Sequence, residues 1–317
     1  MATILWSPSS ELYSGFTSRR LKFQFDIISL YNNVQMERNC NSSQPQAFLE
    51  ADIETGVQLK AVAAADATSP HDGAYPARFT KTLQYWRADI RVDTFMEFQL
   101  LLLTFSTGIQ DGVSYPDFRC FASNQTGNTV VLAVALAGGV ADLFDPVNVG
   151  LSLAAFLAGA VLAGHIGIAV GRRRRAWQFG VNLAQTCMMM GAAWIQFVHG
   201  VEERGAWARA ALTLMAFSSG AQVAAARAMK IPEITTAMAT AAWVDLLIDE
   251  NLIAWKNRPR NRRILFLAAL VAGSFAGAFA RTGVGSPMAL VIAVVVKALV
   301  IGGTLFSKSD HDDDTCG

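Results

Sequence analysis

The sequence predicts an all-α fold: a polytopic membrane helical bundle with six spans and two short re-entrant or discontinuous segments, arranged as two inverted repeats. Three observations support this prediction. Hydrophobic residues make up 52% of the 317 residues and charged residues only 16%, whereas a soluble domain usually has about a quarter charged residues. Apolar runs long enough to cross a bilayer recur after residue 94. Similar stretches of sequence also occur twice, in the same order, within this apolar region.

The region before the first apolar run divides into two parts. Residues 1–78 mix small polar, acidic and proline residues without a sustained hydrophobic period, which predicts a disordered N-terminal tail. Residues 79–94 combine basic and aromatic side chains, as in an amphipathic juxtamembrane segment with aromatics at the level of the lipid headgroups. An ordinary juxtamembrane linker explains that segment equally well. At the other end of the chain, residues 307–317 form an acidic C-terminal tail.

The predicted membrane domain covers residues 95–306. A helix needs about 20 residues to cross the hydrocarbon core, with a range of about 17–25. Six apolar runs have this length, at residues 95–115, 148–170, 176–199, 207–226, 263–281 and 287–306. Two further segments, 126–141 and 234–248, are shorter and contain polar residues. Both are marginal for a full crossing.

Two halves of this domain resemble each other, residues 95–199 and residues 207–306. FSTGIQ at 105–110 is similar to FSSGAQ at 217–222, and LAAFLAG at 153–159 is similar to LAALVAG at 267–273. The offsets are 112 and 114 residues, and a short segment falls between the two landmarks in both halves. Several landmarks in one order indicate a duplication. Each repeat has three spans. Because this number is odd, the second repeat starts on the opposite side of the membrane and is inverted relative to the first.

Loop charge predicts which side of the membrane each loop occupies. Basic residues prefer the cytoplasmic side of short loops. The basic groups lie at residues 81–91, 172–175, 227–230 and 256–263. All four fall on one face only if each short segment enters and leaves by the same face. We therefore expect six spans with both termini cytoplasmic.

The two short segments are the predicted substrate site. Backbone that is not continuous helix cannot face lipid, because its polar groups would lack partners. In transporters with inverted repeats, such segments place helix N-termini at a site near the midplane of the bilayer. We expect the two segments to begin helices here and to face each other across a polar cavity. The candidate substrate-binding residues are Asp111, Asn124, Thr126, Gly127, Asn128, Thr235 and Thr236. The alternative is that these residues only bond one another and seal a rigid core, with Asp111 as an interfacial cap.

Other polar residues within the apolar runs are candidates for a supporting role. Gln110 and Gln222 occupy equivalent positions in the two repeats, and they either tie helices together or bond a ligand. Lys297 lies in the middle of an apolar run. It either extends to the membrane surface or pairs with Asp245 or Asp111. His165 has no partner at ligand spacing, so we expect a packed neutral histidine rather than a metal ligand.

Two stretches of the chain resemble a known family. GIQDGVS at 108–114 and FASNQTGNTV at 121–130 resemble the signature of the YoaK-like membrane proteins, domain-of-unknown-function family twelve seventy-five. TTAMAT at 235–240 and WVDLL at 243–247 resemble the second block of that family, although its usual Thr-Gly pair is replaced around Thr240. The resemblance covers about residues 80–306. It implies a polytopic membrane protein and supplies no activity.

Three classes of function follow from these patterns. The first is a transporter or channel for a small polar or anionic solute. The alternative is a non-transporting membrane scaffold or regulator that uses the N-terminal tail as an interaction arm. An intramembrane enzyme is disfavoured, because the chain has no HExxH, GxSxG or nucleotide-binding loop. The net charge of +1 argues against nucleic acid, and four scattered cysteines predict neither a metal site nor a cofactor. The expected partners are the lipid bilayer and a small solute, and the sequence leaves the oligomeric state open.

Overall fold

The computed structural model describes residues 77–138 and 144–310. Except for its last two residues, the predicted N-terminal tail lies outside the described residues. Residues 311–317 of the predicted acidic C-terminal tail lie outside them as well. Within the described ranges every regular element is an α-helix.

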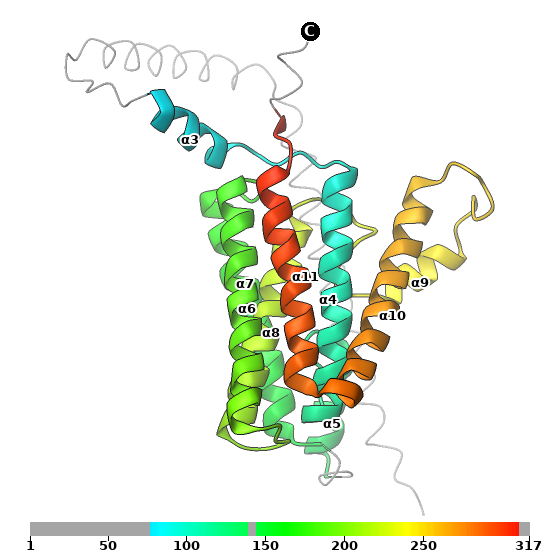
Figure 1. Cartoon of the computed structure of the whole chain (residues 1–317). Coiled ribbons are helices and arrows are strands. Elements are labelled where there is room, and N and C mark those ends of the chain that lie inside the picture. The colour runs from blue at the N-terminus through cyan, green and yellow to red at the C-terminus, as the bar shows by residue number, and fades with distance from the viewer. Residues whose placement is uncertain (1–76, 139–143, 311–317) are drawn as a thin grey trace, which may run out of the picture. The chain divides into compact units, whose positions relative to one another are not determined.

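Helices of two lengths make up the described part of the chain (Figure 1). Six are long, and each coincides with one of the six predicted spans: α4 (Thr94–Phe118), α6 (Pro146–Val170), α7 (Arg175–His199), α8 (Ala206–Arg227), α10 (Arg258–Val284) and α11 (Ser286–Phe306). The short ones are α3 (Ala77–Arg87), α5 (Gln125–Leu136) and α9 (Thr240–Leu247).

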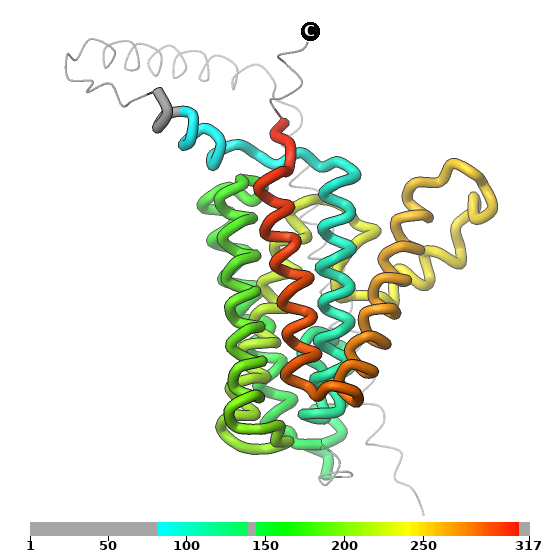
Figure 2. The backbone as a smooth tube through the Cα atoms, in the orientation of Figure 1, coloured from blue at the N-terminus to red at the C-terminus, as the bar shows by residue number. Residues whose placement is uncertain are grey.

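Four of the long helices form a ring. α4 packs against α11, α11 against α7, α7 against α8, and a smaller contact between α8 and α4 closes the ring. The other two long helices lie outside it, because α6 packs mainly on α8 and α10 mainly on α4. The backbone trace shows α11 and α4 running along the bundle from one end to the other (Figure 2).

The outward faces of the bundle are apolar. α6, α10 and α11 are long and apolar enough to cross a membrane. Leu157, Phe275 and Leu299 on these helices are each more than half exposed. Large apolar surfaces of this kind mark a contact with lipid or protein. Together these features indicate an integral, multi-pass membrane protein. α4, α7 and α8 turn buried polar side chains, among them Gln110, Gln185 and Gln222, into the ring.

Glycines bring two helix pairs into backbone contact. A Cβ atom added to Gly273 on α10 would lie 2.1 Å from the carbonyl oxygen of Phe105 on α4. In the same way, a Cβ added to Gly220 on α8 would lie 2.0 Å from the carbonyl oxygen of Phe156 on α6. Small residues allow this close approach in membrane bundles, where van der Waals contact drives helix association.

The two short predicted segments begin differently from each other. α5 begins at Gln125, close to the predicted helix N-terminus. The prediction that a helix begins at Thr235 and Thr236 is wrong, because α9 begins only at Thr240. Thr236 has a φ of 63°, in the left-handed region. The hydroxyl of Thr235 bonds the backbone of Met238, and this local turn competes with helix formation.

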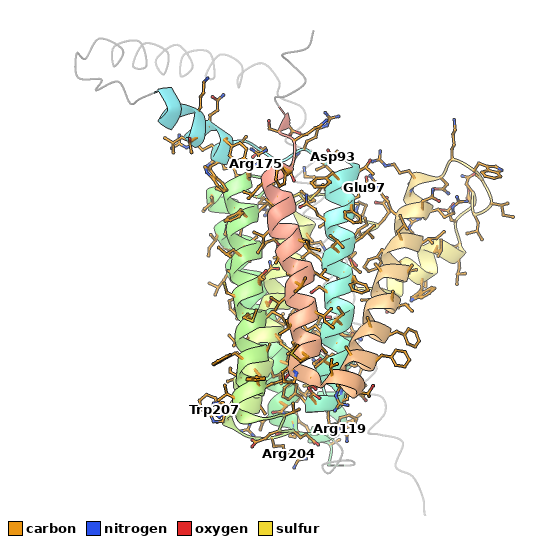
Figure 3. All side chains as sticks on the ribbon, in the orientation of Figure 1. Asp93, Glu97, Arg119, Arg175, Arg204 and Trp207 are labelled. Atoms are coloured by element: carbon orange, nitrogen blue, oxygen red, sulfur yellow. The ribbon has the colours of Figure 1, made fainter. Side chains whose placement is uncertain are left out.

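The segment before α4 docks onto the end of the bundle. α3 ends at Arg87, and the chain then runs in an extended conformation to α4. The backbone N–H of Ile90 donates to the carbonyl of Arg173 at 2.9 Å, and the side chain of Ile90 is fully buried. Arg175 lies over the ring of Tyr85, with 3.9 Å between its guanidinium carbon and the ring centre. Figure 3 shows Arg175 at the same end of the bundle as Glu97, whereas Arg119 and Arg204 lie at the opposite end.

Candidate functional site

The predicted residues of the first short segment mostly hold that segment in place. Asn124 is exposed and caps α5 by accepting a hydrogen bond from the backbone of Gly127 at 3.3 Å. Thr126 is exposed. Asn128 is fully buried, where it donates to the carbonyl of Phe121 at 2.7 Å and accepts from its N–H at 3.0 Å. Asn128 therefore fixes the loop that leads into α5.

Asp111 has the same kind of role from α4. Its carboxylate accepts hydrogen bonds from the backbone N–H of Ser123 at 2.9 Å and from the Ser123 hydroxyl. It also borders an open pocket of about 380 Å³ whose walls include Tyr115, Phe121 and Phe275. Asp111 thus anchors the α4–α5 loop beside a mostly apolar pocket.

The two threonines of the second segment differ in their surroundings. Thr235 lies at a second pocket, of about 510 Å³, together with Arg227 and Lys230. Thr236 is fully buried, and its hydroxyl has no hydrogen-bond partner among the described residues.

The structure does not bring the two predicted segments together. α5 packs against α6, whereas α9 packs against α10. α5 lies at the end of the bundle where α4 finishes, and α9 lies nearer the end where α4 starts (Figure 1). Neither of the two pockets described above is bordered by both segments. Their residues therefore do not form one binding site in this conformation.

The supporting glutamines instead lie buried between α4 and α8. Gln110 Nε2 on α4 donates to Ser219 Oγ at 2.7 Å and to the carbonyl of Met215 at 3.2 Å, both on α8. Gln222 Nε2 on α8 donates to Thr107 Oγ1 at 2.8 Å on α4. Both glutamines are buried, so they tie α4 to α8 inside the bundle.

Lys297 joins this buried polar centre from α11. Its side chain is 2% exposed. Its Nζ donates to Gln185 Oε1 on α7 at 3.3 Å and to Gln222 Oε1. Within residues 77–138 and 144–310, no carboxylate forms an ion pair with Lys297. Gln185 Nε2 is also buried and has no hydrogen-bond partner among those residues.

The carboxylates expected to pair with Lys297 have other partners. Asp245 lies 3.9 Å from Arg263 and is about half exposed, and Asp111 bonds Ser123. The lysine also does not extend to the surface, because it is almost completely buried. Both expectations for Lys297 were therefore wrong. Two amide oxygens, from Gln185 and Gln222, accept hydrogen bonds from this cation instead.

Ion pairs close the bundle on either side of the polar centre. At one end, Arg262 on α10 contacts Glu97 on α4 at 2.6 Å. At the other end, Arg281 on α10 contacts Asp117 on α4, also at 2.6 Å. A cavity of only about 10 Å³, lined by Gln99, Gln178, Asn182 and Thr304 among others, lies inside the ring. That volume is about enough for one water molecule.

The sequence interpretation missed Gln185. The signal was present, because Gln185 lies 112 residues before Lys297, the same spacing that separates Gln110 from Gln222. Gln185 was overlooked because none of the landmarks that suggested the repeat lies on α7 or α11.

The metal and histidine predictions have separate outcomes. In the described ranges no group of three or more His, Cys, Asp or Glu side chains lies close enough to hold a metal ion. His165 is exposed on α6 rather than packed in the interior, so that expectation was wrong.

Comparison with known proteins identifies a family. Residues 99–303 match the family described as protein of unknown function (DUF1275). The match covers well over half of the chain, so the chain belongs to this family. No curated protein and no solved structure matches it.

Proposed function

We propose that this member of the DUF1275 family transports a small anionic solute across the membrane, and that Lys297 holds the anion. The observation that carries the proposal is a buried lysine whose only hydrogen-bond partners among the described residues are two amide oxygens. A charged lysine at the centre of a membrane helix costs about 2.5–3.5 kcal/mol on insertion scales, and such residues usually mark pathways or partners. An anion would supply the missing charge.

The neighbouring amide supports the choice of an anion. Gln185 Nε2 is a buried donor without a partner among the described residues. The oxygen of the same amide, Gln185 Oε1, accepts a hydrogen bond from Lys297. The unpaired donor Nε2 therefore lies close to the lysine ammonium group. A bound anion would accept from both Lys297 and Gln185. It would thereby satisfy a buried donor that otherwise carries a desolvation penalty of about 1–3 kcal/mol.

The proposed architecture is two inverted repeats. Gln222 lies 112 residues after Gln110, and Ser219 lies 112 residues after Thr107. The hydrogen bond from Gln110 to Ser219 is therefore the counterpart of the bond from Gln222 to Thr107. The bonds from these glutamines to the carbonyls of Met215 and Leu103 correspond in the same way. An axis between α4 and α8 that relates the two halves accounts for this pattern.

The helix pairs support the same architecture. The glycine contacts pair α4 with α10 and α8 with α6, and these are equivalent pairs in the two repeats. The proposed axis passes through the polar centre, where inverted-repeat transporters hold their substrate.

We further propose that transport proceeds by movement of these two pairs against each other. Backbone contacts make α4–α10 and α6–α8 tight units, whereas α4 and α8 have few contacts. The ion pairs of Glu97 and Asp117 hold the pair α4–α10 at both ends. The proposed topology has six crossings and both termini in the cytoplasm. It places the basic loops on the cytoplasmic side, where short loops carry an excess of Lys and Arg.

A flux assay with reconstituted protein tests the proposal. Vesicles containing the full chain are loaded and screened with a panel of small anions. We expect saturable uptake of at least one anion, loss of that uptake in Lys297→Met, and normal uptake in Lys256→Met, which removes an exposed lysine. Folded protein that moves none of the anions, or uptake that Lys297→Met leaves unchanged, would contradict the proposal and favour a scaffold or regulator. The proposal is of a transporter rather than an enzyme.

A further inference from the structure

Three basic side chains gather around two pockets at one end of the bundle. Arg227, the last residue of α8, borders both pockets. The first pocket has a volume of about 210 Å³ and is also lined by Arg172 and Trp177. The second, of about 510 Å³, is also lined by Lys230 and Thr235. These pockets lie apart from the Lys297 centre and share no lining residue with it.

Carboxylates of the described residues do not neutralise these three cations. Arg172, Arg227 and Lys230 are exposed, and none of them forms an ion pair with a carboxylate in the described part of the chain. The guanidinium of Arg227 lies 3.9 Å from the sulfur of Met238. Neighbouring cations behave differently, since Arg262 pairs with Glu97. The pockets therefore carry a concentrated positive charge that is available to an external anion.

Apolar surface adjoins this charge. On α9, which follows the second pocket, Trp243, Val244 and Leu247 are all exposed, Leu247 by 71%. On α6, beside the first pocket, Ile166 is exposed as well. In a membrane, such faces lie against acyl chains. A tryptophan such as Trp177 is typical of the headgroup level.

We propose that Arg172, Arg227 and Lys230 bind the phosphate of an anionic phospholipid, whose acyl chains lie along α6 and α9. Basic pockets at the membrane surface between helices suit a phosphate headgroup, and arginine bonds phosphate oxygens in a bidentate manner. The exposed apolar side chains beside the cations favour a lipid over a soluble phosphate. This site is separate from the proposed transport site and does not depend on it.

The test compares two triple variants of the full chain in detergent. Arg172→Gln, Arg227→Gln and Lys230→Gln together remove the proposed site. Lys81→Gln, Arg174→Gln and Lys256→Gln together remove the same charge from exposed residues at the same end of the bundle. Lipid binding is measured by native mass spectrometry and by the shift in melting temperature on addition of phosphatidylglycerol, phosphatidylcholine or inorganic phosphate.

We expect phosphatidylglycerol to bind and stabilise the wild type and the control variant more than phosphatidylcholine does. The site variant should bind it about 100-fold more weakly, since each basic residue near an anionic headgroup contributes roughly a fivefold change in affinity. Equal losses in both triple variants would mean general charge attraction and would overturn the proposal. An equal shift with inorganic phosphate would also overturn it, in favour of a soluble anion.

Discussion

Gln222 Nε2 donates a hydrogen bond of 2.8 Å to Thr107 Oγ1, and the oxygen of the same amide accepts from Lys297. One side chain thus joins α8 to α4 and also holds the buried cation on α11. Gln110, its counterpart in the proposed first repeat, makes only the first kind of link among the described residues. This difference allows the structural and the cation-holding roles of the two amides to be separated.

Replacing the two glutamines should therefore have unequal effects. Gln110→Leu removes two interhelical hydrogen bonds to α8, and one such bond is worth about 0.6 kcal/mol on average in membrane bundles and up to roughly 1.7. Gln222→Leu should cost more, because it also removes an oxygen that contacts Lys297. Thermal unfolding in detergent of both variants measures the difference. Equal stability of the two variants would show that Gln222 does not hold the cation.

The lysine itself should be dispensable for stability. Burying an ion costs several kcal/mol of desolvation, and an apolar side chain of similar volume removes that cost. We therefore expect Lys297→Met to melt at the same temperature as the wild type or higher, while flux is lost. Lys297→Ala, which leaves a cavity, provides the contrast and should melt lower. A large loss of stability in Lys297→Met would assign the lysine a structural role.

The six long helices could be predicted because bilayer thickness fixes the length of an apolar run. The boundary of α9 could not, since it depends on the left-handed conformation of Thr236 and the turn at Thr235. Those local bonds compete with a helix whose composition alone suggests an earlier start. The separation of α5 from α9 was also missed. The sequence places them at equivalent positions of the two proposed repeats, and the proposed inversion of the second repeat would move equivalent positions toward opposite ends of the bundle.

The residues of the polar centre were recognised individually from the sequence, but their arrangement was not. Gln110, Gln222 and Lys297 stand out because polar residues are rare in apolar runs. Which of them meet depends on how α4, α7, α8 and α11 rotate about their axes in the ring. Backbone contacts such as that of Gly273 on α10 with Phe105 constrain the rotation of α4, and a single sequence does not show which glycines meet which carbonyls.

Those backbone contacts give a third prediction. Gly273→Ala should destabilise the bundle strongly, because the new Cβ would lie 2.1 Å from the carbonyl oxygen of Phe105 and the two helix backbones would have to separate. Overpacking of this kind costs about 1–3 kcal/mol or more. Gly164→Ala is the matched control, since nothing lies within 4 Å of its added Cβ. Detergent-stable yield and melting temperature check the pair, and equal behaviour of both variants would contradict the packing.

A fourth prediction concerns the loop between α4 and α5. Burial, together with the charges of Asp111 and Asp145, raises the pKa of the Cys120 thiol to about 12. A raised thiol pKa favours the neutral form, so Cys120 as the sole cysteine should react slowly with maleimide at both about pH 7 and about pH 9. The exposed thiol of a Thr126→Cys variant should react with maleimide roughly 20-fold faster at the higher pH than at the lower one. Rapid labelling of folded Cys120 would mean that the loop opens.

The last prediction concerns sidedness and rests on the two ends of the bundle. Lys256 and Glu202 are both exposed, in loops at opposite ends, with Lys256 among the basic residues before α10. Positive charge holds short loops in the cytoplasm. Labelling intact cells with an impermeant maleimide should therefore modify Glu202→Cys and spare Lys256→Cys, while permeabilised cells should label both. Asn124, in a glycosylation sequon, should remain unmodified because it lies too near the membrane. Labelling of Lys256→Cys but not Glu202→Cys in intact cells would mean that the topology is reversed. Labelling of both sites in intact cells would mean that the segment between α8 and α10 crosses the membrane as well.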